Sequence, residues 1–383
     1  MRKNGVARTF EPLGECAVLA NGFTREKLAF SRLAPPGAVY CRPPAESAYI
    51  TGGNLQKPYF HALSETAAKK DKAKAVLFLN GAEKPFSAKE KETCEKYLKE
   101  LFCDLKIGKN ELAIFTNDSS PSQTISRRYK ISVGGYPCEI DFLLRVSAGG
   151  FTGEKTVGGE NTEVSYRQLL ILTDARISSP MLLKMLKSLY ADPLGCTGDS
   201  ADGGLFDAAA FLSGCGAENY PIDRADAEYG KAFRLIRSAL TDFLAFAAES
   251  CGEKLITAEV RGAKSAREAV GAATSFARRN SVAESLKRGR LNPYAVLEAI
   301  GAAGFASAET ANVYLTSETG KICVVYEGKP LFPATEAQRT VLKGGNAKIL
   351  AELGAGNYSA SACIFIRQET EQNQKTEQNQ VNI

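Results

Sequence analysis

The chain has 383 residues, of which 44% are hydrophobic and 24% are charged, and its net charge is +5. This balance is typical of a folded protein with an ordinary core, and it excludes a disordered chain and a small disulfide-stapled protein. The sequence contains a single histidine, His61, and no tryptophan. A single histidine excludes a metal site built on two or more histidines, and any Ser-His or Cys-His mechanism would have to use His61.

Hydrophobic periodicity and capping residues predict strands and helices that are mixed in blocks along the chain. The predicted strands are 75–79, 111–116, 169–173, 254–260 and 361–366, with hairpins over 129–146, around Gly134-Gly135, and over 312–331. A capping box at Ser87 predicts a helix over 87–101, Pro180 starts another, and a long helix follows Asp223 and runs to about Glu249. Capping boxes at Ser265 and Ser281 predict two further helices, and 292–304 is predicted as the last. Such blocks favour a layered α+β protein over a doubly wound parallel sheet.

Charge and cysteine usage narrow the class of protein further. The basic residues form one local cluster that lacks an aromatic residue, which favours a solvated helix surface over a nucleic-acid site: Arg278, Arg279, Lys287, Arg288 and Arg290. Ten cysteines are scattered through apolar segments without a Cys-x-x-Cys pair, as expected of reduced thiols. No signal peptide and no stretch of roughly 18 apolar residues is found. We therefore expect a cytoplasmic protein that binds neither membranes nor nucleic acids.

Three polar segments resemble functional sites, and for each the simpler structural interpretation is favoured. The loop 149–156 resembles a phosphate-binding loop, but Glu154 stands where a glycine is needed before Lys155-Thr156. Asp199 and Asp202 lie in a glycine-rich segment where paired aspartates are typical of a turn. No partner acid is identifiable for His61. We expect no metal and no cofactor.

Several segments, in the right order, resemble one family, the bifunctional ornithine acetyltransferase / N-acetylglutamate synthase of arginine biosynthesis. These segments are 27–44, 72–90, 112–121, 169–190 with its Thr-Asp-Ala turn, 258–286 and 292–305. The resemblance covers nearly the whole chain up to about Thr370, and its specificity lies in order and spacing. It implies an αββα layered core, like that of N-terminal-nucleophile enzymes, with a second, smaller α/β domain.

The resemblance also implies a nucleophile. Members of the family cut their own chain before a threonine, whose hydroxyl then attacks the acetyl donor while its free amine serves as the base. Counting back from the Thr-Asp-Ala turn without gaps puts Tyr166 at this position, and a phenol cannot replace the hydroxyl. A shift by one residue puts Ser165 there, and Thr162 is an alternative nucleophile if an insertion follows it. The absence of any nucleophile stays a third interpretation.

Other positions follow from the same resemblance. The oxyanion hole would be Thr116 and Asn117, which retains a backbone N–H and an amide donor. The resemblance points to four substrate-binding candidates: Lys155, Glu249, Arg367 and Thr370. Lys155 and Arg367 are suited to hold a substrate carboxylate.

From the resemblance we expect a core domain over 1–255 with a candidate self-cleavage loop near 162–166, a smaller α/β domain over 256–345, returning strands over 346–367, and a disordered tail over 368–383. We favour an enzyme that transfers acetyl from N-acetylornithine, or from acetyl-CoA, to glutamate. The alternatives are a non-catalytic paralogue that binds a metabolite or a partner, and a self-cleaving serine aminopeptidase-like hydrolase. Family members assemble from paired chains, which implies a homo-oligomer, or a heterotetramer after self-cleavage.

Overall fold

The structure is a computed structural model, and it describes residues 11–14, 23–26, 33–51, 72–80, 112–117, 122–147, 150–151, 167–191, 208–214, 216–303 and 308–367. These residues divide into two compact units. The first unit takes the described residues up to 147 together with 167–188 and 208–243, and the second takes 150–151, 189–191 and 244–367. The predicted domain limits stay a prediction.

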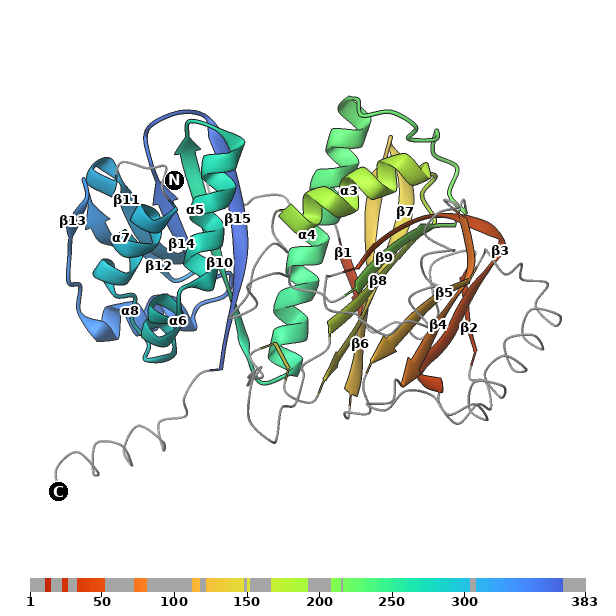
Figure 1. The fold of residues 1–383 in the computed structure, drawn as a ribbon, viewed down its shortest axis with the longest axis horizontal. Coiled ribbons are helices and arrows are strands. Elements are labelled where there is room, and N and C mark those ends of the chain that lie inside the picture. The colour runs from red at the N-terminus through yellow and green to blue at the C-terminus, as the bar shows by residue number, and fades with distance from the viewer. Residues whose placement is uncertain are drawn as a thin grey trace, which may run out of the picture. The chain divides into compact units, whose positions relative to one another are not determined.

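A nine-stranded sheet forms the first unit (Figure 1). Its strands are β1 (Glu11–Gly14), β2 (Phe23–Glu26), β3 (Leu33–Thr51), β4 (Lys72–Asn80), β5 (Leu112–Asn117), β6 (Ser122–Val133), β7 (Tyr136–Ser147), β8 (Arg167–Thr173) and β9 (Ala208–Ser213). Eight of them follow the order β1-β6-β7-β8-β9-β3-β4-β5, and β2 pairs with β3. The predicted strands 75–79, 111–116 and 169–173 are thereby confirmed as β4, β5 and β8, although β5 begins at Leu112.

The hairpin predicted around Gly134-Gly135 is confirmed as β6 and β7, which pair along their full lengths. Both glycines have positive φ, 60° and 86°, a conformation that other residues rarely adopt and that a two-residue hairpin turn requires. The long, fully paired hairpin holds the central strand β7 next to β8.

Two helices belong mainly to the first unit, α3 (Ser179–Ala191) and α4 (Ala227–Ser250), and Figure 1 shows them side by side. Inside α4, Phe243 stacks on Phe142 of β7 with ring centroids 5.4 Å apart, and Asp242 accepts a hydrogen bond of 3.0 Å from the Tyr129 hydroxyl of β6. These contacts show which face of the sheet α4 covers. α4 begins as predicted after Asp223, and Asp226 caps it by accepting the N–H groups of Glu228 and Tyr229.

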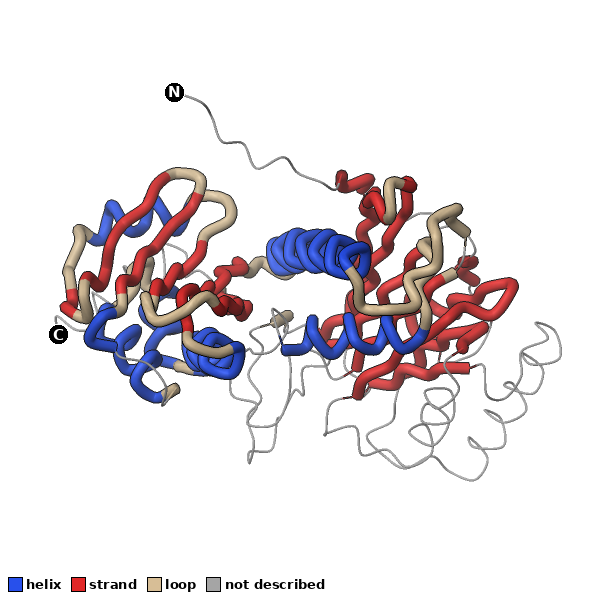
Figure 2. Tube along the Cα trace, turned by 90° about the horizontal axis from the view of Figure 1, so that it is seen from above, coloured by secondary structure: helices blue, strands red, loops and turns tan. Residues whose placement is uncertain are grey.

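The second unit is a six-stranded sheet with helices on one face (Figure 2). Its strands are β10 (Lys254–Ala263), β11 (Asn312–Ser317), β12 (Gly320–Tyr326), β13 (Lys329–Pro330), β14 (Lys348–Glu352) and β15 (Tyr358–Ile366), in the order β13-β12-β11-β14-β10-β15. Its helices are α5 (Ala266–Arg278), α6 (Asn280–Lys287), α7 (Pro293–Ala302) and α8 (Thr335–Lys343), with a short 3-10 turn, η1 (Ala308–Thr310).

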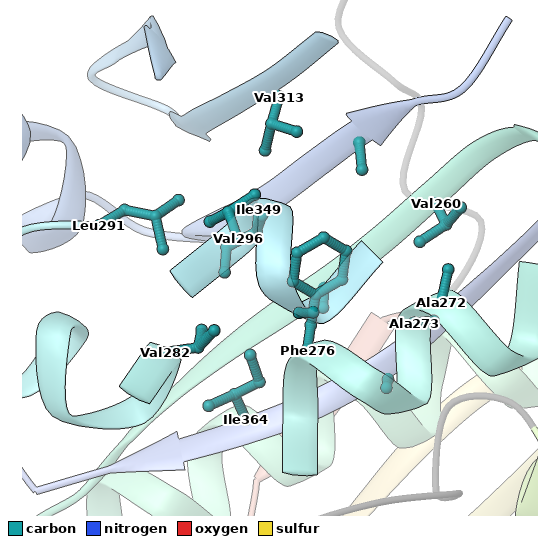
Figure 3. Packing of buried hydrophobic residues seen from close by; sticks show 14 of the residues in the cluster. Val260, Ala272, Ala273, Phe276, Val282, Leu291, Val296, Val313, Ile349 and Ile364 are labelled. Carbon is teal, nitrogen blue, oxygen red and sulfur yellow. The ribbon is translucent and has the colours of Figure 1, made fainter. Parts of the chain in front are cut away.

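Small apolar residues on α5 allow the helices to lie close to this sheet. Phe276 of α5 is surrounded by side chains from the sheet and from α7, among them Ile364, Ile349 and Val296 (Figure 3). All four side chains are at most 2% exposed. This continuous core makes the second unit a compact body with its own hydrophobic centre.

The predicted helix starts are confirmed in part. Ser265 caps α5, accepting the Glu268 N–H at 3.1 Å, while the Glu268 carboxylate returns to the Lys264 N–H at 2.6 Å. The capping box predicted at Ser281 is wrong, because α6 already begins at Asn280 after Arg279 and has no side-chain cap. The helix predicted over 87–101 lies outside the described residues.

Candidate functional site

The residues predicted to form the site are only partly within the described part of the chain. Outside it lie the two nucleophile candidates and two substrate-binding candidates: Thr162, Ser165, Lys155 and Thr370. The weighed residues His61, Asp199 and Asp202 also lie outside it. Thr116 and Asn117 are placed by their strand, and Glu249 and Arg367 are described in full.

The start of β8 fixes where the chain returns to the sheet after the nucleophile candidates. Arg167, its first residue, pairs with Val146 near the end of β7. The next residue, Gln168, is fully buried and pairs with Arg145 of β7, whose side chain is 2% exposed. The sheet therefore carries buried polar side chains at the point where the chain enters it after Ser165.

These polar groups share one face of the sheet. Phe142 faces α4, so its neighbours Asp141 and Leu143 point to the opposite face, and Arg145 follows two residues later on the same side. Arg128 of β6 lies opposite Asp141 and donates to both of its carboxylate oxygens, at 2.7 and 2.9 Å. Asp141 has no exposed side-chain surface. A buried bidentate pair of this kind favours the observed register of β6 and β7 and places two paired, opposite charges on this face of the sheet.

The strand directions place Thr116 and Asn117 at the carboxyl ends of the parallel strands, whereas β8 starts at their amino ends. β4, β5, β8 and β9 all run in the same direction, because β4 pairs in parallel with β5, β8 pairs in parallel with β9, and β3 is antiparallel to both β4 and β9. Thr116 and Asn117 end β5 and therefore lie toward the carboxyl ends of these strands. β8 starts at the opposite ends, and its seven residues alone span roughly 20 Å.

The long strand β3 pairs with β9 and with β4 along different parts of its length. Glu46 of β3 pairs with Ser213, the last residue of β9, and also with Lys72, the first residue of β4. β4 and β5 thus continue along β3 beyond the point where β9 ends. The described strands do not bring Thr116 and Asn117 to the start of β8.

The Thr-Asp-Ala turn after β8 is held by its own hydrogen bonds. The Thr173 hydroxyl donates to the Glu139 carbonyl at 2.9 Å, and Asp174 accepts the Glu139 N–H at 2.7 Å. Burial raises the pKa of Asp174 to about 6, an effect that the Glu139 N–H opposes and the neighbouring carboxylates of Glu139 and Asp141 increase. These bonds fasten β8 to β7, so the turn is structural in this arrangement.

Of the two described substrate-binding candidates, Glu249 lies near the end of α4 with its side chain exposed, whereas Arg367 follows the last strand, β15. One Arg367 nitrogen lies 3.6 Å from a carboxylate oxygen of Glu253, whose side chain is fully buried. The structure thus brings Arg367 to Glu253, a residue that the sequence did not single out. Little in the sequence points to Glu253, since a carboxylate just after a helix end is usually exposed.

Glu253 has a second partner at the start of the glycine-rich segment. Its other oxygen accepts the Phe151 N–H at 2.9 Å in a buried hydrogen bond. The Phe151 ring stacks on Phe365 of β15, with centroids 4.1 Å apart and planes 2° apart. Glu253, Phe151 and Arg367 therefore form one cluster within the second unit.

An open hollow beside the Gly134-Gly135 turn is lined by the first turns of α4 and by residues 220–224. Its rim carries exposed ion pairs, Arg224 with Asp226 and Lys231 with Glu228. Exposed pairs of this kind contribute little binding energy, and none of the predicted site residues lines the hollow.

Two negative findings apply to the described residues alone. No three of their histidine, cysteine, aspartate or glutamate side chains gather as metal ligands would. No helix within the same residues is both long enough and apolar enough to cross a membrane.

Comparison with known proteins gives a curated relative and two solved structures. Arginine biosynthesis bifunctional protein ArgJ 1 of Clostridium acetobutylicum is 26% identical over 196 residues, which are 50% of this chain and 48% of that protein. The chain spans about half the length of this relative. A crystal structure of arginine biosynthesis bifunctional protein ArgJ from Bacillus halodurans is 20% identical and covers 54% of this chain and 96% of its own, with a TM-score of 0.42. The PH0078 protein of Pyrococcus horikoshii OT3 is 11% identical, covers 60% and 83%, and has a TM-score of 0.35.

A family model, that of the ArgJ family, matches residues 168–365, from the second residue of β8 to the penultimate residue of β15. The match covers more than half of the chain and includes parts of both units. The predicted α+β class is confirmed, since helices and strands are mixed in both units. The αββα layering stays an expectation from the family resemblance. The chain belongs to the ArgJ family.

Proposed function

We propose that the chain is an acetyltransferase of arginine biosynthesis that moves an acetyl group from N-acetylornithine, or from acetyl-CoA, to glutamate. One observation carries the proposal, the family match that begins at Gln168, three residues after Ser165. The name of the Clostridium relative, an arginine biosynthesis bifunctional protein, supports the same activity. The substrates are small amino acids, and we place the protein in the cytoplasm.

In this proposal the chain first cuts itself between Val164 and Ser165. The Ser165 hydroxyl then attacks the acetyl carbonyl of N-acetylornithine, and the free amine of Ser165 accepts the hydroxyl proton. Ornithine leaves as an amine after taking up a proton, and the acetyl group stays on the serine oxygen as an ester. The amine of glutamate attacks this ester, which releases N-acetylglutamate and restores the hydroxyl. The mechanism uses no histidine, consistent with a chain that has only His61.

Acetyl transfer from N-acetylornithine to glutamate tests the proposal when it is measured together with the state of the chain. S165A should leave one intact chain and lower transfer by at least about a thousandfold, because it removes the attacking hydroxyl. S165T restores the residue type that the family uses, so it should retain both activities. T162A is the matched variant. If cleavage and transfer are lost in T162A but kept in S165A, the nucleophile is Thr162 and not Ser165.

Thr116 and Asn117 remain the proposed oxyanion donors. Both residues lie at the carboxyl end of β5, whereas β8 starts at the opposite ends of these strands. The proposed mechanism therefore requires the chain before Arg167 to approach Thr116 and Asn117. T116A alters only the side chain, so N117P, which also removes the backbone N–H, is the sharper variant. Removal of one oxyanion donor should lower kcat by about 100- to 1,000-fold without affecting cleavage. An unchanged kcat in N117P would remove this pair from the mechanism.

A second candidate function, that of a non-catalytic paralogue, is favoured by the position of Thr116 at the opposite strand ends from the start of β8. In a non-catalytic paralogue Tyr166 occupies the nucleophile position and Thr116 has no reacting group to serve. Such a protein would bind a small amino acid or a partner chain without turnover. It predicts an intact wild-type chain, and Y166T would then be the variant that regains cleavage.

A further inference from the structure

We propose that one exposed surface of the second unit docks an acidic segment of another protein that also carries apolar side chains. This aromatic–basic surface is formed by side chains from three places in the sequence: Arg288, Arg290, Tyr294, Leu331 and Phe332. All of them lie in the second unit. The inference goes beyond the proposed acetyl transfer, because none of these residues belongs to the proposed active site.

The apolar part of the surface consists of exposed side chains from two separate segments. Tyr294 at the start of α7 is 60% exposed, Phe332 just after β13 is 70% exposed, and their ring centroids lie 5.7 Å apart. Leu331 is a third exposed apolar side chain, and its N–H donates to the Val324 carbonyl at 2.9 Å, which ties this segment to β12. Exposed apolar side chains that gather in this way are typical of an interaction site.

The fold brings these rings to the basic cluster, which has no aromatic residue of its own in the sequence. Gln338 of α8 makes the connection, since its side-chain oxygen accepts the Leu291 N–H at 2.8 Å and its nitrogen donates to the Pro333 carbonyl at 3.0 Å. Gln338 is 4% exposed, so this link is part of the buried structure. The segments of Arg290 and Phe332 are therefore held side by side, although they are distant in the sequence.

The two arginines of the surface are positioned by the end of α6. The Arg290 N–H donates to the Ser285 carbonyl at 3.1 Å, and Gly289 turns the chain with a φ of +73°. The Arg339 side chain of α8 lies against Gly289, where a Cβ atom would be 2.8 Å from the Arg339 Cγ. A glycine is therefore favoured by the turn and by this close approach, and the backbone of Arg288 and Arg290 is fixed on either side of it.

Arg288 and Arg290 carry positive charge that their neighbours do not neutralise. Both side chains are exposed, and neither forms an ion pair with any residue that the structure describes. The carboxylate of Glu336 is already paired with Arg339 at 2.7 Å. Arg288 also suits the carboxyl end of α6, where a cation is favourable, whereas Arg290 lies beyond the helix. The surface therefore offers unpaired positive charge to an anionic partner.

The residue types of the surface indicate which anionic partner fits. Arginine and aromatic residues are enriched at the centre of protein–protein interfaces and carry much of their binding energy. A single-stranded nucleic acid is favoured by rings that successive bases can cover, whereas Tyr294 and Phe332 contact each other with their planes 52° apart. Arginines match carboxylates, and the two rings with Leu331 match apolar side chains. An acidic protein segment with interspersed apolar residues is therefore the partner that fits.

Fluorescence anisotropy tests the surface in the full chain, with a dye-labelled synthetic peptide that alternates glutamate and leucine. The wild-type chain should bind this peptide with a Kd of about 100 μM or tighter. R290E and F332A should each weaken binding by about tenfold or more, because one reverses a charge of the surface and the other removes a ring. A peptide with glutamine in place of glutamate should also bind about tenfold more weakly or less.

Two matched controls come from the same unit. K264E makes the same kind of charge reversal at another exposed position, and Y358A removes another exposed ring, that of a side chain 52% exposed at the start of β15. Both should bind the acidic peptide within about twofold of wild type, since surface changes away from an interface have small effects. Because all four residues are exposed, denaturation curves should show that every variant folds as wild type does.

The outcomes decide the occupant as well as the place. Weaker binding in R290E and F332A, with both controls unchanged, supports the proposal. A wild-type chain that does not bind the acidic peptide, or that binds the glutamine peptide equally well, overturns it, and so do R290E and F332A chains that bind as wild type. Tighter binding of oligothymidylate than of the acidic peptide at the same salt would assign the surface to nucleic acid. Self-association that F332A abolishes in size-exclusion chromatography would assign it to a second copy of the chain, and either result overturns the proposed partner.

Discussion

Val146 of β7 pairs with Arg167 of β8, so the chain enters the sheet two residues after Ser165. Cleavage before Ser165 would therefore divide the nine-stranded sheet between two polypeptides. β8 and β9 would belong to the second fragment, and β1 to β7 would belong to the first.

We predict that the two fragments remain associated after cleavage. β8 pairs with β7 over seven residues and β9 pairs with β3 over six, and the β8 residues after Arg167 are fully buried. Breaking these ladders would expose backbone groups and apolar side chains together. The fragments should co-elute in native size-exclusion chromatography and separate only in denaturant. Elution at two positions without denaturant would contradict this arrangement, and uncut S165A provides the marker for the associated form.

The buried pair of Arg128 and Asp141 predicts a large loss of stability in R128A. Asp141 has no exposed side-chain surface, so the variant leaves a buried carboxylate without its bidentate partner. Chemical denaturation should show a loss of about 3–5 kcal/mol in the free energy of unfolding. R224A is the comparison, because the Arg224 side chain is 82% exposed and its pair with Asp226 should contribute at most about 1 kcal/mol. Equal losses in the two variants would contradict the burial of Asp141.

Asp174 predicts a pH dependence of stability. Its folded pKa of about 6 lies above the ordinary value of 3.8, so the folded state binds more protons between these two values. The contribution of Asp174 to stability is therefore greatest below pH 3.8 and is lost as the pH rises through about 6.

D174N should remove this dependence, since an amide keeps an oxygen for the Glu139 N–H and carries no charge. At pH 7 the variant should be more stable than wild type by about 1–3 kcal/mol, and the difference should vanish near pH 4. The measurement is a series of denaturation curves at stepped pH. A D174N protein that is less stable than wild type at pH 7 would show that the charge is needed.

Much of the fold could be predicted because its signals are local. The β6–β7 hairpin follows from two adjacent glycines between alternating segments, and α7 follows from the cap of Asn292, which accepts the Tyr294 N–H at 3.0 Å. β9 was missed because its sequence, AAAFLS, is rich in alanine and lacks alternation. It is a strand because β8 and β3 pair with it on both sides.

The site was harder to predict because its relationships are not local. Thr116 lies near the carboxyl end of its strand in any arrangement of the sheet, and only the order and direction of the strands around β3 decide which other strand ends lie beside it. Glu253 resembles an exposed residue after a helix, and its buried hydrogen bond is to Phe151, which precedes it by 102 positions. Pairings over such distances leave no periodic pattern in the sequence.

The mass and N-terminal sequence of the purified chain in denaturant test the central claim most directly. The account predicts two fragments, with the second beginning Ser165-Tyr166-Arg167, and an S165A chain that stays whole. An uncut wild-type chain with no acetyl transfer from N-acetylornithine would contradict it and leave a family member without the reaction.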